Sequence, residues 1–558
     1  MENIKFALIS NISETSLWVD DTFEDDIDYS SFMFDAKQYN DQYFKSLVNP
    51  EERLKNIVRN AVVRPNLIKY KGRNFSAQLD TLINLYSSNY ARIGQAENPE
   101  ICLNGIFLKS YLESNGIPTK ILSDVKLDED FVKSLSQLPQ NISAIGISTT
   151  FIVDWNDLRE VASFIRVHMP ETKIIVGGPL AFLLKCLDKD SCIRVLSSLS
   201  GYVDYVIIEQ NGEITLKNLL QSINKRESPT NIPNLAIISE SGFTLTGYKE
   251  EKGTFNENVI HWDKVELPEY VNTVPIETSR GCPFRCNFCS YTKFHRYMLK
   301  PLDSLREELR SLKNCNNIEY ISFVDGSLNA IPHRIEEICQ MMIDEQIGLK
   351  WHFMGNVKGL SKKQAELMAK SGCEIANIGV ESGSDFIRRK MNKPIESNDE
   401  IKQAFYNLSN AGIIGRGFFF VGYPGENEDT IAETIDLINN TDMDLFRMAI
   451  FRPRVNSDVC LNEATYQNGL MGKGYLWRHN TCDSMQASEY LLDILKNTKP
   501  VYDPARGVYE IMQLGISKEL ALKLNQLKNQ MMQNILCGYN HLSYTKIERD
   551  FRGLLDNN

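Results

Sequence analysis

Along most of the chain, short apolar runs alternate with longer segments in which apolar residues recur every three or four positions. Runs such as Ala144-Ile-Gly-Ile-Ser148 predict buried strands. The segments 302–312, 333–342 and 398–408 have the spacing of amphipathic helices. Because strands that alternate with helices form parallel β-α-β units, the pattern indicates an α/β protein.

The N-terminal half predicts an open, doubly wound, Rossmann-like sheet. Helical spacing over 105–113 and 158–167 separates its apolar runs. About five strands are expected, at 4–9, 119–122, 144–148, 173–178 and 203–208. Ligands of such sheets bind outside the carboxyl ends of the strands.

The second half predicts a partial barrel of six parallel β-α units, followed by a mostly helical C-terminal region. Asp325, Glu381 and Gly422 each follow an apolar run, which places them at the carboxyl ends of barrel strands. The expected organisation is a Rossmann-like domain at 1–225 with an insertion at 11–98, a linker at 226–272, a barrel at 273–455 and a helical region at 456–558.

Charge and composition narrow the classes of partner. The net charge of −11 argues against bulk nucleic-acid binding, which needs a basic face. No run approaches the roughly 20 apolar residues that span a bilayer, and the N-terminus has no signal-peptide pattern, so no membrane association is expected. Nine of the twelve cysteines are scattered singly, which favours a reducing, cytoplasmic location.

The remaining three cysteines share one short loop, Thr278-Ser-Arg-Gly-Cys-Pro-Phe-Arg-Cys-Asn-Phe-Cys-Ser290. Thiolates at Cys282, Cys286 and Cys289 can converge on one iron–sulfur cluster. Three ligands leave one iron of a [4Fe–4S] cube open to an external ligand. A structural zinc site would need a fourth ligand, and no second Cys or His pair lies nearby. The spacing therefore predicts an open-site cluster.

This loop resembles the cluster loop of the radical S-adenosylmethionine (SAM) enzymes. Three later segments resemble further motifs of that family in the expected order: 321–327, 378–384 with 390–393, and 417–426. The resemblance implies that the open iron binds SAM. It also implies a set of SAM-contacting residues, with Glu381 on the ribose: Phe288, Asp325, Glu381, Ser382 and Gly422. Taken alone, Asp325 is more typical of a helix cap or a tight turn than of a cofactor contact.

Small residues follow the predicted N-terminal strands, and no Gly-x-Gly-x-x-Gly dinucleotide turn is present. The domain resembles the cobalamin-binding domain that precedes some radical SAM cores. The resemblance implies cobalamin contacts at Ser148, Thr149, Gly177, Gly178, Pro179 and Glu209. The Asp-x-His-x-x-Gly motif is missing, so we expect cobalamin with no histidine below the metal. A Rossmann-like domain retained only for packing is the alternative.

The resemblance implies a methyltransferase of natural-product assembly. Reductive SAM cleavage would generate a radical that removes hydrogen from a small-molecule or peptide substrate, and methylcobalamin would donate the methyl group. A flavodoxin or ferredoxin would supply electrons. Tyr423, Trp477 and His479 are candidate substrate contacts. A radical rearrangement, ring contraction or cyclisation, a methylthiotransferase without cobalamin and a non-enzymatic scaffold are the alternatives.

Overall fold

The computed structural model describes residues 5–10 and most of 101–536, together with short pieces of 69–74 and 549–553. Within 101–536 the undescribed residues are 123–126, 140–141, 151, 153–154, 253, 269–270, 292–295, 396, 454–456, 462–467, 474–475, 504–506 and 514–515. The predicted insertion at 11–98 lies outside the described residues, except for β2 (Lys69–Tyr70) and β3 (Arg73–Asn74).

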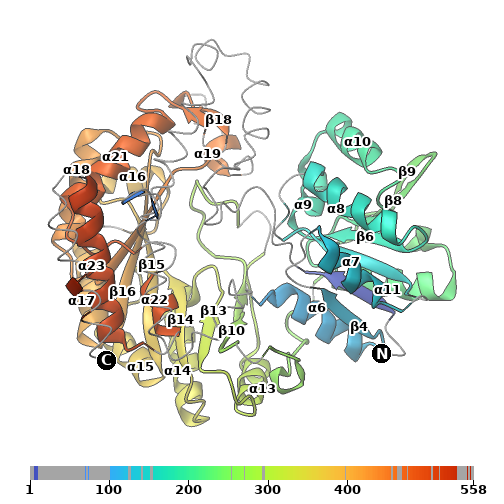
Figure 1. The fold of residues 1–558 in the computed structure, drawn as a ribbon, viewed down its shortest axis with the longest axis horizontal. Coiled ribbons are helices and arrows are strands. Elements are labelled where there is room, and N and C mark those ends of the chain that lie inside the picture. Colours follow the sequence, from blue (N-terminus) through green and yellow to red (C-terminus); the bar gives the residue numbers. More distant parts are fainter. Residues whose placement is uncertain are drawn as a thin grey trace. The chain divides into compact units, whose positions relative to one another are not determined.

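The chain forms two compact units (Figure 1). The first contains β1 and residues 99–267 and 299–316, and the second contains residues 268–298 and 317–558. No helix in the described part of the chain is both long enough and apolar enough to cross a bilayer.

The first unit is built on a seven-stranded sheet in the order β4-β1-β5-β6-β7-β8-β9. Its five parallel strands are those that the sequence predicts: β1 (Phe6–Ile9), β4 (Thr119–Leu122), β5 (Ala144–Ser148), β6 (Lys173–Gly177) and β7 (Tyr205–Ile207). The segment expected as a linker contains β8 (Leu235–Ser239) and β9 (Gly242–Leu245), which extend the sheet antiparallel to β7.

Helices cover both faces of this sheet, as the doubly wound prediction requires (Figure 1). Buried side chains of α7 (Glu129–Ser136), α8 (Trp155–His168) and α10 (Lys189–Ser198) pack on one face with Ile145 and Val176. Those of α6 (Leu103–Ser114) and α11 (Glu213–Lys225) pack on the other face, with Phe6, Ile175 and Ile207. The short α9 (Pro179–Leu183) follows β6.

The second unit contains six parallel strands whose order in the sheet is their order in the chain. They are β10 (Thr273–Ile276), β13 (Tyr320–Phe323), β14 (Lys350–Gly355), β15 (Cys373–Glu381), β16 (Ile414–Val421) and β17 (Leu445–Ile450). Strands joined in this way by helical connections form the predicted partial barrel.

One helix or more follows each of the barrel strands β13 to β16. These helices are α14 (Pro332–Asp344), α15 (Lys362–Lys370), α16 (Asp385–Lys390), α17 (Asn398–Asn410) and α18 (Glu428–Asn439). Alternate residues of a strand face opposite sides of the sheet. We call the side on which Gly415 packs against Phe405 of α17 the outer face, and the side of Ile414 the inner face.

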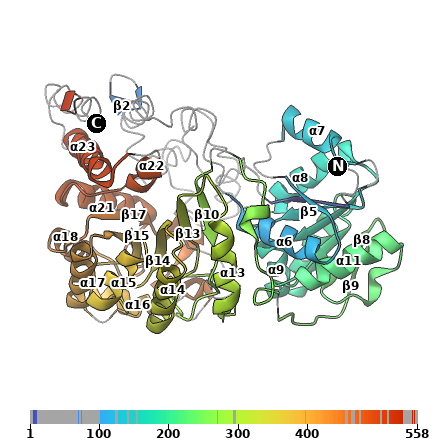
Figure 2. The same cartoon turned by 90° about the horizontal axis from the view of Figure 1, so that it is seen from below.

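The predicted helical C-terminal region is present. Its described elements are α19 (Asp458–Leu461), the hairpin β18 (Met471–Lys473) with β19 (Leu476–Arg478), α21 (Ser484–Asn497), α22 (Val508–Gln513) and α23 (Lys518–Leu536). Val508 and Ile511 of α22 and Leu524 of α23 pack on the inner face with Ile375 and Ile414. Figure 2 shows α14 and α15 on one side of the strands and α22 on the other. The amino-terminal end of the inner face is therefore closed by the C-terminal helices.

Candidate active site

The cysteine loop leaves the carboxyl end of β10 and is tied to β13 by Asp325. One carboxylate oxygen of Asp325 accepts hydrogen bonds from the hydroxyls of Thr278 (2.8 Å) and Ser279 (2.5 Å), and the other accepts from the backbone N–H of Thr278 (3.2 Å). Asp325 is only 2% exposed, and this burial raises its pKa to about 6. The residue predicted to contact SAM therefore binds the first residues of the cluster loop.

The other end of the loop is fixed by the turn that follows α16. The backbone N–H of Asn287 donates to the carbonyl of Met391 (2.8 Å), and its side chain donates to the carbonyl of Lys390 (2.9 Å). Asn392 donates in return to the carbonyl of Arg285 (2.7 Å). Phe288, a predicted SAM contact, packs its ring 4.9 Å from that of Phe420 on the inner face.

The three loop cysteines are free and partly buried. Burial raises the pKa of Cys282, and it raises that of Cys286 to about 12. The three thiols interact electrostatically, and Lys393 opposes the upward shift at both Cys282 and Cys286.

In the described chain no three His, Cys, Asp or Glu side chains are close enough to share a single metal ion. A cube has its irons at separate corners, so its thiolates are spread more widely than the ligands of a single ion. Three thiols on one anchored loop, beside a cation, are the ligand set that a [4Fe–4S] cluster with one open iron requires.

Glu381 lies at the end of β15 and pairs with Lys393, their Oε1 and Nζ atoms 2.7 Å apart. Both side chains are mostly buried, and Glu381 has a positive φ of 72° at an irregularity in the β15–β16 register. Burial alone would lower the pKa of Lys393, but Glu381 and Cys286 reverse the effect and raise it. Sequence reasoning missed Lys393 as a site residue, although it ends the segment 390–393 that carried the resemblance.

Ser382, also a predicted SAM contact, points away from this pair. Its hydroxyl accepts from the backbone N–H of Ser384 (3.2 Å) and lies 3.5 Å from the hydroxyl of Thr434. At 1% exposure it stabilises the turn between β15 and α16. A direct contact of Ser382 with SAM stays a prediction.

The turn after β16 is held by a buried carboxylate. Glu426 accepts hydrogen bonds from the backbone N–H groups of Gly422 and Tyr423, and burial raises its pKa to about 8. Gly422 has a φ of +91°, and a Cβ there would lie 2.5 Å from the ring of Trp477. Only glycine fits this left-handed, crowded position without strain.

The three candidate substrate contacts pack against this turn. Tyr423, Trp477 and His479 are 2%, 0% and 8% exposed. His479 Nε2 donates to the carbonyl of Gly422 (3.0 Å), its Nδ1 accepts from the N–H groups of Thr481 and Cys482, and its ring stacks on Trp477 at 5.2 Å. Burial lowers the pKa of His479, which keeps the ring neutral. These contacts position the turn, and a role in substrate binding stays a prediction.

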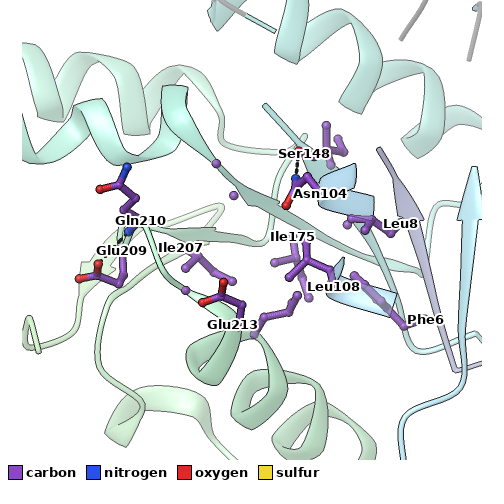
Figure 3. A pocket seen from close by; sticks show the side chains of 16 residues that line it. Phe6, Leu8, Asn104, Leu108, Ser148, Ile175, Ile207, Glu209, Gln210 and Glu213 are labelled. Atoms are coloured by element: carbon purple, nitrogen blue, oxygen red, sulfur yellow. Dashed lines mark hydrogen bonds between the residues drawn. The ribbon is translucent and has the colours of Figure 1, made fainter. Parts of the chain in front are cut away.

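The first unit contains a pocket between the sheet and the helices α6 and α11 (Figure 3). Its floor is apolar and includes Phe6, Leu8, Ile175 and Ile207. Its polar lining includes a hydrogen bond of 2.8 Å from Asn104 to Ser148. The remaining lining residues are Leu108, Gly146, Ile147, Gly177, Gly178, Glu209, Gln210, Gly212, Glu213 and Leu216.

Four of the six predicted cobalamin contacts line this pocket: Ser148, Gly177, Gly178 and Glu209. Thr149 lies behind them, because its hydroxyl donates to the carbonyl of Gly177 (2.9 Å) and accepts from the N–H of Leu180 (3.1 Å). Pro179 begins α9. Asn104, Gln210 and Glu213 are lining residues that sequence reasoning missed.

The lining fits a large, flat ligand. A Cβ at Gly177 would find its nearest neighbour 3.9 Å away, at Ile207, so the backbone there is open to close approach. Apolar floor and polar rim together are typical of cofactor sites.

An anchored three-thiol loop on a parallel partial barrel defines an iron–sulfur enzyme site. Residues 276–438 match the Radical SAM superfamily. Over these residues, which include the cysteine loop, Asp325 and Glu381, the chain is similar to the radical SAM enzymes.

Similarity to curated proteins extends beyond the barrel. An uncharacterized methyltransferase from Pyrococcus horikoshii is 25% identical, over 58% of this chain and 69% of its own length. An anaerobic magnesium-protoporphyrin IX monomethyl ester cyclase from Rubrivivax gelatinosus is 26% identical over 63% and 64%. The 4'-phospho-dehydrooxetanocin synthase from Priestia megaterium is 25% identical over 69% and 53%. The matches thus span between about half and about two thirds of these relatives.

Two solved enzymes share the fold at low sequence identity. The radical SAM methyltransferase TsrM from Kitasatospora setae, solved with cobalamin and a [4Fe–4S] cluster, has a TM-score of 0.55 at 17% identity over 67% of this chain and 74% of its own. OxsB, solved with aqua-cobalamin and SAM, has a TM-score of 0.56 at 17% identity over 82% and 79%. Both enzymes were solved with cobalamin bound.

Proposed function

We propose that this chain is a cobalamin-dependent radical SAM methyltransferase acting on a small-molecule or peptide substrate. The observation that carries the proposal is the anchored cluster loop. Its three thiols lie between Asp325 on one side and the 390–392 turn on the other. The pocket on the first unit and the fold shared with TsrM and OxsB support the cobalamin part.

The residues of the barrel unit have separate tasks in binding the cofactors. Cys282, Cys286 and Cys289 would hold the cluster and leave one iron open for SAM. Glu381, oriented by Lys393, would accept hydrogen bonds from the ribose hydroxyls, as acidic residues do in nucleotide sites. The Gly422 turn, fixed by Glu426 and His479, would leave room for the adenine.

On the first unit, Ser148, Gly177, Gly178 and Glu209 would contact cobalamin, with Asn104 holding Ser148 in place. When bound, the reduced cluster and SAM supply one-electron chemistry for hydrogen abstraction, and methylcobalamin supplies the methyl group. The protein's own contribution is to hold these groups in fixed positions. A flavodoxin or ferredoxin is the proposed electron donor.

A second candidate function is a rearrangement, ring contraction or cyclisation with cobalamin bound and no methyl transferred. The cyclase from Rubrivivax gelatinosus and the synthase from Priestia megaterium favour it, because they match this chain as closely as the methyltransferase relative does. The mass of the product separates the two reactions.

A methylthiotransferase, the third candidate, would need a second cluster on the first unit. Cys102 directly precedes α6 and donates to the carbonyl of Ser10 (3.2 Å). Cys192 lies in α10, which packs on the opposite face of the sheet. Cysteines on opposite faces of a sheet do not converge on one cluster, so this function is disfavoured.

The test begins with the full chain, purified and reconstituted without oxygen and then incubated with hydroxocobalamin. We expect about four irons and about one cobalt per chain after unbound cofactor is removed. A Cys282→Ala/Cys286→Ala/Cys289→Ala variant should lose iron and keep cobalt, because the two sites are on different units. Wild-type protein that binds iron but no cobalt contradicts the cobalamin proposal.

The reaction itself is tested with SAM carrying a deuterated methyl group and a panel of small-molecule and peptide substrates. Transfer of the label to a product supports the methyltransferase. An isomerised or cyclised product that carries no deuterated methyl group contradicts methyl transfer and favours the second candidate.

A further inference from the structure

The inner face of the barrel sheet carries a layer of three polar side chains, of which Asn377 and Arg416 are buried. His352 of β14, Asn377 of β15 and Arg416 of β16 form this layer, which we call the polar layer. Asn377 and Arg416 are direct partners in the β15–β16 register. The side chain of Asn377 contacts that of His352, with Nδ2 and Nδ1 3.5 Å apart.

Hydrogen bonding within the polar layer leaves His352 with an unused donor. Because Asn377 Nδ2 faces Nδ1 of His352, the proton of the neutral ring lies on Nε2. Burial, followed by the charge of Arg416, lowers the pKa of His352 to about 3, so the ring is neutral. Its Nε2 is buried and has no hydrogen-bond partner. Asn377 also donates to the carbonyl of Phe353 (3.0 Å), while its Oδ1 has no partner.

Arg416 is a second donor that the protein satisfies only in part. Its side chain is 5% exposed, and its Nε lies 2.8 Å from Oδ2 of Asp503. The same carboxylate is 3.5 Å from Nη2 of Arg447, so one anion serves two guanidinium groups. Arg416 Nη2 is buried without an acceptor. Donors left unsatisfied in this way are uncommon and costly in folded proteins.

The polar layer lies between an aromatic ring on one side and exposed apolar side chains on the other. On the amino-terminal side Tyr509 of α22 packs against it, with its ring 4.1 Å from that of His352. On the carboxyl-terminal side Val324 and Met354 are 43% and 40% exposed. Exposed apolar side chains next to buried, unsatisfied N–H donors are suited to a ligand with an apolar body and an oxyanion end.

We propose that the polar layer binds an oxyanion of the substrate, a carboxylate or a phosphate, and that the apolar body of the substrate lies along Val324 and Met354. The N–H groups of Arg416 Nη2 and His352 Nε2 donate to the oxyanion, and Asn377 Oδ1 accepts from a neighbouring hydroxyl or N–H group. This deepens the proposed function and rests on it, because Glu381 ends the strand that carries Asn377.

Four ligands with one body and different ends test the proposal: 4-phenylbutyrate, 4-phenylbutyl phosphate, 4-phenylbutanol and 4-phenylbutylamine. Binding to the reconstituted full chain with saturating SAM is measured by calorimetry. At least one of the two anions should bind about tenfold tighter than the alcohol, and the amine should not bind. The two anions distinguish a carboxylate from a phosphate substrate.

Substitutions in the polar layer test which residues cause the preference for anionic ligands. Arg416→Gln should reduce the affinity for the anion to that for the alcohol, and Arg416→Lys should restore part of it. Asn377→Asp, which places a carboxylate beside Arg416, should also remove the preference. Lys350→Gln is the matched control. Lys350 lies in β14, the strand that carries His352, and is a half-exposed cation paired with Glu374 at 2.9 Å.

Four results would overturn the proposal: equal binding of all four ligands, tighter binding of the amine, an anion preference that persists in Arg416→Gln, or no binding of either anion. Iron content and SAM affinity are measured on the same samples. Wild-type protein that holds no iron or does not bind SAM would contradict the proposed function. Wild-type protein that holds iron and binds SAM but binds neither anion would contradict only the substrate assignment. A fifth result, displacement of SAM by the anions, would place them at the SAM site and also contradict the polar-layer proposal.

Discussion

The Glu381 carboxylate and the Lys393 ammonium group lie 2.7 Å apart and fill the space that a side chain at Gly379 would need. A Cβ at Gly379 would be 2.6 Å from Oε1 of Glu381 and 2.8 Å from Nζ of Lys393. The glycine is therefore part of the proposed SAM site through its contact with the ion pair. Its role is to let the ion pair take one fixed geometry.

Gly379→Ala should weaken SAM binding with little effect on cluster loading. The added methyl group displaces Glu381 from Lys393, so the carboxylate loses its orientation toward the ribose. We expect the affinity for SAM to fall about tenfold, which corresponds to about 1.4 kcal/mol. Equilibrium binding of SAM to the reconstituted protein measures the change.

The control for this variant is Gly247→Ala. A Cβ at Gly247 meets no atom within 4 Å, so the same substitution there should leave SAM binding unchanged. SAM affinity equal to wild type in Gly379→Ala, at full iron content, would show that the ion pair does not orient the ribose contact.

Glu426→Gln should change the dependence of stability on pH. The folded pKa of Glu426, about 8, lies above its ordinary value of 4.5. The stabilising form is thus the protonated one. Its contribution is complete below pH 4.5 and is lost as the pH rises through 8. A shift of this size is worth on the order of a few kcal/mol.

Glutamine mimics the protonated acid, since its carbonyl can accept from the N–H groups of Gly422 and Tyr423. The variant should therefore gain melting temperature over wild type as the pH rises from 5 to 8.5, with little difference at pH 5. Glu428→Gln, at an exposed position of α18, is the control and should follow wild type. A constant difference between Glu426→Gln and wild type at every pH would rule out the buried titration.

The strands and the cluster loop could be predicted because their signals are local. The five parallel strands of the first unit are short apolar runs, and the three cysteines lie within eight residues of one another. Gly422 could be placed at a strand end for the same reason.

Other site residues were beyond sequence reasoning because packing brings them together across long separations. Lys393 follows Glu381 by a whole helix, and Asp503 reaches Arg416 from beyond the barrel. Trp477 and His479 were singled out as candidate substrate contacts, and that role stays a prediction. Their burial against the Gly422 turn depends on contacts that no local pattern encodes.

The pocket of the first unit offers a test of cobalamin binding that leaves the barrel intact. Gly177 lines the pocket. A Cβ added at Gly177 would have Ile207 as its nearest neighbour, 3.9 Å away. Because Gly177 ends β6 and has no positive φ, valine fits the backbone there. Its two methyl groups would occupy space that the proposed ligand needs.

Gly177→Val should reduce retained cobalt about tenfold, a loss of about 1.4 kcal/mol in binding, while iron content and melting temperature stay at wild-type values. Gly177→Ala should have a smaller effect, and Gly247→Val, outside the pocket, none. Metal analysis of the reconstituted, desalted proteins measures all three. Full cobalt retention by Gly177→Val would show that cobalamin does not bind over this strand end. Parallel loss of cobalt and melting temperature would indicate damage to the fold, and the graded Gly177→Ala variant would then decide between the two.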